Sequence, residues 1–173
     1  MIEQEVVIEE AQALDAQGLA EIMSLVQEES DFLTRDSDSP DMTVEEAGLF
    51  IDKQASATNA ICLLAKIGTT VIGVLNVSAG NFTRIDHIGE IFLAVRKDYQ
   101  GYGVGKFLME ALIDWAENTP HIRRLELTVQ ARNSKAVHLY KKYGFDIEAT
   151  KKRGAKTKEG EFLDVYAMAR LID

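Results

Sequence analysis

Three glycines lie close together in "QGYGVGK", Gln100 to Lys106, directly before a segment whose apolar residues recur at helical spacing. Glycine allows successive backbone N–H groups to turn toward one point, because no side chain blocks the approach. At a helix N-terminus these groups are unpaired donors, and the helix dipole favours negative charge there. The segment therefore predicts an anion site, with a pyrophosphate as its natural occupant. The same glycines would also suit an ordinary tight turn.

Two nucleotide-binding motifs contain similar glycines, and this sequence matches neither. A P-loop needs a hydroxyl after its Gly-Lys pair, whereas Phe107 follows Lys106, and its first glycine is replaced by Gln100. A dinucleotide fingerprint needs a third glycine where Lys106 stands. The pattern that remains is Q-x-x-G-x-G, formed by Gln100, Gly103 and Gly105.

A second group of polar residues follows in "NSKAVHLYKKYGF". Asn133, Ala136 and Tyr140 are three or four residues apart, so a helix places them on one face. Asn133 and Tyr140 are about two turns apart, roughly 10 Å along the axis. Both side chains can therefore contact one elongated ligand. Asn133 can also serve as a helix cap, and Tyr140 can also be a core residue.

Together, the two segments resemble the GNAT superfamily of N-acetyltransferases. One family motif is a strand ending in Val, followed by [QR]-x-x-G-x-[GA], which corresponds to "GEIFLAV" and "QGYGVG" here. The other is Asn-x-x-Ala-x-x-x-Tyr-x-x-x-Gly-Phe, matched by Asn133, Ala136, Tyr140, Gly144 and Phe145. The resemblance covers essentially the whole chain. It implies direct transfer of an acetyl group from acetyl-CoA to an amine, without an acyl-enzyme and without a metal.

The resemblance also implies where acetyl-CoA binds. The loop holds the pyrophosphate, and the edge of the preceding strand pairs with the pantetheine arm, where a backbone N–H polarises the thioester carbonyl. A bulge is expected in that strand. The expected cofactor-binding residues are Leu93, Ala94, Val95, Gln100, Gly101, Tyr102, Gly103, Val104, Gly105, Lys106, Asn133 and Ala136.

Two residues are expected to handle protons. By the family pattern, Tyr140 is the general acid for the departing thiolate, since a phenol is protonated at neutral pH. Glu90 is the expected base, acting through water, because a charged residue within "IGEIFLAV" suggests a cavity. His87 and His138 are weaker candidates for the base, and Tyr143 is expected to be structural.

The resemblance also implies that the acceptor amine binds near residues 30–50 and the "KTKEGEF" hairpin, and the acidic residues Asp31, Asp36, Asp38 and Asp41 lie in the first of these segments. A small amine, an amino acid, a protein N-terminus and a lysine all remain open. The alternative function is a sensor that binds acyl-CoA without turnover. A phosphotransferase would require the hydroxyl that Phe107 replaces.

The supporting elements follow from periodicity and capping. The sequence predicts strands near residues 6–11, 60–67, 70–78, 86–95 and 123–129, and two closing strands from 146 onward. Helices are predicted over 15–27, from a capping box at Thr43 and Glu46, over 103–118, and from Asn133 to Gly144. The apolar stripe expected on the third helix is Phe107, Leu108, Ala111, Leu112 and Trp115. The expected fold class is α+β, a mixed and mostly antiparallel sheet of about seven strands flanked by about four helices.

Composition limits the partners. The 173 residues carry a net charge of −9, which argues against nucleic acid or an anionic membrane. Cys62 is the one cysteine and lies in the apolar "ICLLA", so a buried thiol is expected. The N-terminus lacks the pattern of a signal peptide, and no apolar run approaches membrane length. We expect a single cytoplasmic domain over 1–173 that acts on a small-molecule or peptide amine, with a homodimer left open.

Overall fold

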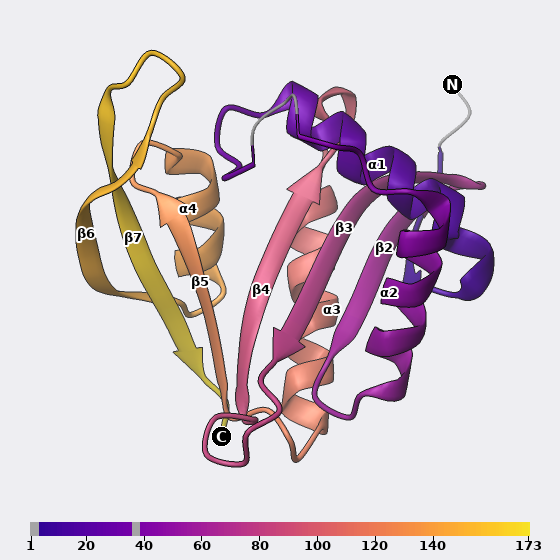
Figure 1. The fold of residues 1–173 in the computed structure, drawn as a ribbon. Helices are drawn as coiled ribbons and strands as arrows, with labels where there is room; N and C mark the ends of the chain where they lie inside the picture. The colour runs from indigo at the N-terminus through magenta and orange to yellow at the C-terminus, as the bar shows by residue number, and fades with distance from the viewer. Residues whose placement is uncertain (1–3, 36–38) are drawn as a thin grey trace.

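The computed structural model describes residues 4–35 and 39–173, and in them seven strands form one sheet in the order β1-β2-β3-β4-β5-β7-β6 (Figure 1). Every neighbouring pair is antiparallel except β4 and β5, which are parallel. The strands are β1 Val6–Glu10, β2 Ile61–Ile67, β3 Thr70–Ala79, β4 Ile88–Val95, β5 Arg124–Gln130, β6 Asp146–Lys156 and β7 Phe162–Leu171. Asp36 and Asp38 lie outside the described residues.

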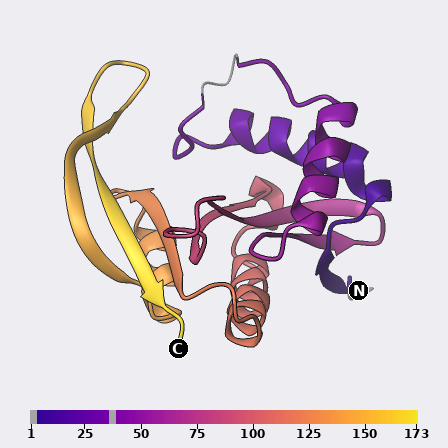
Figure 2. The ribbon, with the colours of Figure 1, turned by 60° about the horizontal axis from the view of Figure 1, so that its bottom comes forward.

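The helices cover both faces of this sheet. α1 (Ala16–Glu29) and α2 (Val44–Ser56) pack on one face, and α3 (Val104–Asn118) and α4 (Ser134–Lys142) pack on the other. Figure 2 shows α1 and α2 above the sheet and α3 below it. Short 3-10 helices span Ala13–Asp15 and Lys97–Tyr99. The order of elements and the mixed, mostly antiparallel sheet are confirmed.

Side chains alternate between two cores along β4, as the pleat of a strand requires. Ile91, Leu93 and Val95 pack in the core between the sheet and helices α3 and α4. Phe92 and Ala94 pack in the core between the other face of the sheet and helices α1 and α2. Because the two cores share one sheet, each residue of β4 is assigned to a definite face. This assignment decides from which side each side chain reaches the site described below.

Local capping sets three helix ends as the sequence predicts. Thr43 Oγ1 accepts the N–H of Glu46 at 3.0 Å at the start of α2, and Asn133 Oδ1 accepts the N–H of Ala136 at 3.4 Å at the start of α4. Gly144 follows α4 with a φ of +83°, a left-handed conformation that glycine adopts without strain.

The apolar stripe expected on α3 is rotated in the structure. The buried residues are Val104, Leu108, Met109, Leu112 and Ala116, whereas the Phe107 side chain is exposed. The helix lies on the sheet along its i, i+4 row, 104-108-112-116, with Met109 beside it, so Phe107 lies outside the buried face. Ala111 and Trp115 are partly buried against the core.

β4 and β5 touch over three residue pairs and then separate (Figure 1). The pairs are Ile88↔Arg124, Gly89↔Leu125 and Glu90↔Glu126. The expected bulge is wrong, because β4 pairs with β3 without any register shift from Ala79↔Gly89 to Gly73↔Val95. Each strand follows its other neighbour, since β4 stays paired with β3 and β5 stays paired with β7, and the two part without a register shift in β4.

Two further sequence expectations concern burial and membranes. Cys62 is buried, and burial together with the nearby carboxylates of Asp15 and Glu10 raises the pKa of its thiol to about 12. The thiol is therefore protonated and unreactive at neutral pH. Within the part of the chain that the structure describes, the helices are all too short or too polar to cross a bilayer.

Candidate active site

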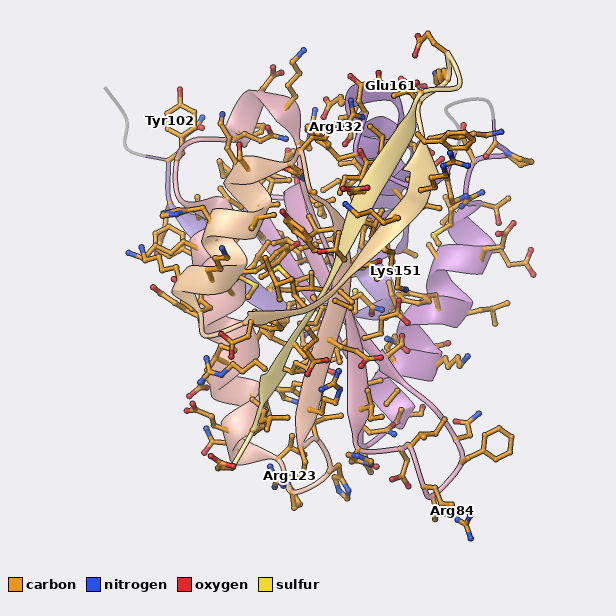
Figure 3. All side chains as sticks on the ribbon, turned by 90° about the vertical axis from the view of Figure 1, so that its left-hand side faces the viewer. Arg84, Tyr102, Arg123, Arg132, Lys151 and Glu161 are labelled. Carbon is orange, nitrogen blue, oxygen red and sulfur yellow. The ribbon has the colours of Figure 1, made fainter. Side chains whose placement is uncertain are left out.

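A cleft of about 1140 Å³ opens where β4 and β5 part. It is lined by the end of α1 and the loop after it, by β3, β4 and β5, by the loop before α3, and by α4. Because the gap passes between two strands, the cleft reaches both faces of the sheet. Both expected catalytic residues line it, as does every expected cofactor-binding residue except Tyr102. The Tyr102 side chain points outward into solvent (Figure 3).

The edge of β4 offers free backbone groups to this cleft. The N–H of Arg96 donates to the carbonyl of Ile72, so in the alternating antiparallel pattern Ala94 also bonds to β3. The peptide groups of Leu93 and Val95 then point to the other side, where β5 has already moved away. Val95 O accepts Gln100 Nε2 at 3.0 Å. Both groups of Leu93 and the N–H of Val95 remain available, and Ala94 contributes its side chain.

The glycine loop leaves a run of backbone donors unpaired. Gly101 and Gly103 have φ values of +85° and +84°, which turn the chain into α3. The N–H groups of residues 101–106 donate to no atom of residues 4–35 or 39–173, and the first bond into the helix is Phe107 N to Gly103 O at 3.0 Å. These donors sit at the positive end of the α3 dipole. The loop therefore has the geometry of an anion site.

Two other features of this loop have structural causes. A Cβ on Gly105 would lie 3.3 Å from Leu139 Cδ2, so glycine there allows α3 and α4 to pack closely. Lys106 Nζ lies 3.9 Å from Glu110 Oε1 on the surface, so its charge is loosely paired and is available near the loop.

Tyr140 reaches the cleft from the side of α3 and α4. Its side chain is buried, its ring lies 6.0 Å from that of Phe145, and burial raises the pKa of its hydroxyl to about 12. Among the described residues, that hydroxyl has no hydrogen-bond partner. Tyr143, by contrast, donates to Glu110 Oε1 at 3.1 Å on the surface. The hydroxyl that lines the cleft is therefore protonated and free to donate.

Glu90 reaches the same cleft from the opposite face. Its side chain is exposed, and it lies beside Ser78 in the register of β3 and β4. The side chain of Gln54 on α2 supports this wall, since its Nε2 lies 2.6 Å from Asn76 Oδ1 and 3.2 Å from Ser78 Oγ. Of the two histidines considered as alternatives, His138 lines the cleft and is exposed, whereas His87 does not line it.

Arg132, which is labelled in Figure 3, lines the cleft and connects two of its walls. Its Nη2 donates to the carbonyl of Asp31 at 3.0 Å, its guanidinium lies 5.2 Å from the centroid of the Phe32 ring, and its Nε donates to Gln130 Oε1 at 2.8 Å. The loop after α1 is thereby tied to the far wall. The residues of the expected acceptor region that line the cleft are Ser30, Phe32, Leu33, Thr34 and Arg35. Asp31, Asp41 and the hairpin over 156–162 are not part of its lining.

Sequence reasoning did not find Gln27, Arg132, Asn76, Ser78 or Gln54. Gln27 was detectable, because it stands four residues after Met23 and so continues the buried face of α1 as a polar residue. The others depend on which strands and loops become neighbours, and no local pattern reveals that.

The chain matches the model of the acetyltransferase (GNAT) family over residues 20–145. It belongs to the GNAT family of acetyltransferases. A GNAT-family acetyltransferase from Streptococcus pneumoniae has the same fold, with a TM-score of 0.94 and 44% identity, over 97% of this chain and 100% of that one. The L-amino acid N-acetyltransferase AaaT of Escherichia coli is 37% identical over 109 residues, which are 63% of this chain and 67% of that protein.

A more distant acetyltransferase fold was solved with its ligand. The yncA protein of Salmonella typhimurium, described as a putative acetyltransferase with its cofactor acetyl-CoA, has a TM-score of 0.86 and 19% identity, over 98% of this chain and 95% of that one. At that identity the likeness establishes the fold. As a GNAT-family member with named N-acetyltransferase relatives, this chain is an acyltransferase enzyme.

Proposed function

We propose that this GNAT enzyme transfers the acetyl group of acetyl-CoA directly to the primary amine of a small molecule. The observation that carries the proposal is that the parting of β4 and β5 brings an unpaired donor loop, a free strand edge, Tyr140 and Glu90 to one cleft. The N-acetyltransferase relatives support the same reaction. The proposal takes residues 1–173 as one catalytic domain, because α1, β3, β4, α3, β5 and α4 all contribute residues to the lining of this cleft.

The residues present fit acetyl-CoA. The six unpaired N–H groups of residues 101–106 suit its pyrophosphate, and Lys106 adds a positive charge. The free peptide groups of Leu93 and Val95 can pair with the amides of the pantetheine arm as a strand would. Asn133 uses its Oδ1 for the cap of α4, which leaves its N–H₂ to donate to the ligand. When bound, acetyl-CoA supplies an acyl thioester.

A free N–H of the β4 edge would donate to the thioester carbonyl oxygen and draw electrons from its carbon. Leu93 and Val95 each hold such a group at a fixed position in the strand. Because β3 pairs with the other side of β4 along its length, this donor is oriented before the ligand arrives.

Tyr140 would protonate the leaving sulfur. As the C–S bond breaks and the C–N bond forms, its hydroxyl gives its proton to the sulfur, and the free thiol departs. Since burial raises the pKa of this hydroxyl to about 12, Tyr140 carries that proton at any physiological pH.

Glu90 would receive the proton that the amine loses, directly or through water. It lines the cleft on the face of α1 and α2, whereas Tyr140 lines it on the face of α3 and α4. The acceptor is therefore expected to enter between α1 and the sheet, and its amine to attack the thioester carbon held at the β4 edge. This arrangement keeps the proton acceptor and the proton donor on opposite sides of the reacting carbon.

The experiment is a free-thiol release assay with acetyl-CoA and a panel of amines, amino acids and peptides, together with calorimetry using coenzyme A and ATP. The expected result is binding of coenzyme A and thiol release with a small amine. Binding of ATP without coenzyme A would overturn the assignment of the loop. Binding of coenzyme A without thiol release from any acceptor would favour the sensor instead.

A further inference from the structure

Gln27 is a buried glutamine whose hydrogen bonds are not accounted for by the fold. Its residue is 6% exposed, on the inner face of α1, and it lines the cleft between β4 and β5. Among residues 4–35 and 39–173, its side chain has no hydrogen-bond partner. In that part of the chain, the one unpaired side-chain atom that is fully enclosed is Arg96 Nε. The atoms of the Gln27 amide are therefore not fully enclosed, and they are accessible from the cleft that Gln27 lines.

Apart from Gln27, the buried residues with an amide or a charged side chain in the described structure are Asp15, Gln54, Lys66 and Gln130, and all four are paired. The comparison with Gln54 is direct. Gln54 is 5% exposed, and its Nε2 lies within hydrogen-bond distance of Asn76, Val77 and Ser78. Lys66 pairs with Asp15, and Gln130 accepts from Arg132. Leaving a buried amide unpaired is destabilising, so such a group is expected to have a partner that binds from outside the chain.

The position of Gln27 selects the acceptor rather than acetyl-CoA as that partner. α1 packs on the face of the sheet that carries Glu90, Phe92 and Ala94. The unpaired donor loop and Tyr140 lie with α3 and α4 on the other face. Gln27 therefore lines the part of the cleft in which the amine is expected to approach Glu90.

The charges of the cleft indicate what kind of amine fits. The charged side chains that line it are Glu29, Arg35, Glu90, Lys106, Arg132, Lys135 and Lys142. Lys106, Lys135 and Lys142 belong to α3 and α4, beside the proposed phosphate site. Glu29 already accepts the N–H of Lys97 at 2.7 Å. On the α1 side the carboxylates of Glu29 and Glu90 lie with the cations Arg35 and Arg132, so this part of the cleft carries charges of both signs and suits an amine that also carries an anion better than a polyamine.

We propose that Gln27 is a specificity-determining residue of the acceptor site, where its amide N–H donates to the carboxylate of an amino acid whose amino group faces Glu90. This rests on the proposed acetyl transfer and names the class of acceptor. A neutral amide suits the task, because it binds the carboxylate by a directed hydrogen bond and does not compete with Glu90 for the ammonium.

The test uses Gln27→Met, which keeps the length of the side chain and removes its hydrogen bonds. The matched control is Gln17→Met, an exposed glutamine on the same helix that bonds to Glu21 and lies outside the cleft lining. Thiol release is measured with amino acids, with the corresponding amino acid amides and with spermidine. The melting temperature of each variant is measured as well.

The wild-type enzyme is expected to favour amino acids over their amides and over spermidine by about tenfold or more in kcat/KM. Gln27→Met should raise the KM for amino acids about tenfold, remove the preference over the amides, and leave the KM for acetyl-CoA unchanged. Its melting temperature should equal or exceed that of the wild type, because an unpaired buried polar group is removed. Gln17→Met should change none of these kinetic constants.

Two results would overturn the inference while leaving acetyl transfer intact. One is an unchanged KM for amino acids in Gln27→Met, and the other is equal use of amino acids, amides and spermidine by the wild type. A lower melting temperature with unchanged kinetics would show that Gln27 is structural. If the wild type acetylates no amine at all, the proposed function fails first, and the assignment of the acceptor fails with it.

Discussion

Arg132 Nη2 donates to the carbonyl oxygen of Asp31 at 3.0 Å, and its guanidinium lies over the Phe32 ring. This contact joins the corner after β5 to the loop after α1, across 101 positions of sequence. It fixes one wall of the proposed acceptor side of the cleft relative to the other, since the loop is bound through both its backbone and an aromatic ring.

Arg132→Ala is expected to loosen the loop after α1 and to raise the KM for the acceptor several-fold. This is the size of effect expected from the loss of one cation–π contact and one hydrogen bond. The KM for acetyl-CoA should change little. Faster amide hydrogen exchange in residues 31–35 is the accompanying structural measurement. Arg153→Ala removes a similar stack on Phe162, 4.9 Å away in the β6–β7 hairpin, and serves as the control. Equal effects of the two variants would contradict a role for Arg132 in the cleft.

Tyr140→Phe is expected to lower kcat by about a hundredfold or more, with the KM for acetyl-CoA nearly unchanged, because it removes the proton donor but not the ring. Tyr143→Phe is the matched control, since it removes a hydroxyl that bonds only to Glu110 on the surface. Steady-state kinetics of the two variants decide the matter. A full rate in Tyr140→Phe would remove Tyr140 as the acid.

The pH profile offers an independent check on Tyr140. Its pKa is raised by burial from 10.0 to about 12, so ionisation of this hydroxyl should not reduce the rate near pH 10. The folded protein keeps a proton there that the unfolded chain releases. The associated stability is therefore complete below pH 10 and declines as the pH rises toward 12. An alkaline loss of rate near pH 9 would have to come from another group.

Glu90→Gln is expected to lower the rate about a hundredfold at neutral pH and to leave acetyl-CoA binding intact. Without a base, the reaction depends on amine that arrives unprotonated, so the residual rate should recover as the pH is raised. Glu126→Gln is the control, because Glu126 is the β5 partner of Glu90 in register, binds Arg124, and does not line the cleft. If Glu90→Gln keeps the wild-type rate at neutral pH, the base that accepts the proton of the amine would be a water molecule or His138 instead.

Gly101→Ala should weaken binding of coenzyme A about tenfold or more. A Cβ there meets nothing within 4 Å, so its effect comes from the left-handed backbone and from the obstructed N–H groups. Gly160→Ala in the turn between β6 and β7 is closely matched, with a φ of +90° and also nothing within 4 Å. Both changes should cost about 1–2 kcal/mol of stability, but only the first should alter calorimetric binding. Equal affinities would argue that the loop is merely a turn.

Asp15→Asn is expected to destabilise the fold by about 2–4 kcal/mol, because it leaves the buried Lys66 ammonium with Glu9 alone. Although burial opposes it, pairing with Asp15 and Glu9 raises the pKa of Lys66 above 10.5. The stabilisation is therefore complete below pH 10.5 and is lost as the pH rises through the higher folded value. Urea unfolding at pH 7 measures the change. Glu9→Gln, at the exposed side of the pair, should cost under about 1 kcal/mol.

The parts of the fold and site that the sequence predicted are those encoded within one element or one turn. The glycines of residues 101–105 fix a local backbone path, and the spacing of Asn133 and Tyr140 fixes a helix face, so both were predictable. The stripe on α3 was misassigned at Phe107, because periodicity alone does not show which row of a helix meets the sheet. The bulge in β4 was wrong, because the divergence of two strands arises from the sheet as a whole.

The acceptor side was the least predictable part. Its residues come from α1, α2, β3 and the corner after β5, and all except Gln27 are unremarkable in their own segments. The place of Gln27 on the apolar face of α1 was detectable, but that its amide is unpaired at the cleft was not. Arg132 reads as a surface charge until Asp31 and Phe32 are seen beside it. These properties depend on contacts between distant segments, which a pattern in one sequence does not contain.

The short contact between β4 and β5 also has a mechanical consequence. β3 and β4 share seven register pairs, as do β5 and β7, but β4 and β5 share three. The sheet thus consists of two firmly paired halves that are joined at one end. A ligand whose amides bond along β4 while its other groups contact α4 would lie between the two halves and hold them together. Substrate binding would then stiffen the enzyme across its weakest seam, and product release would restore its flexibility.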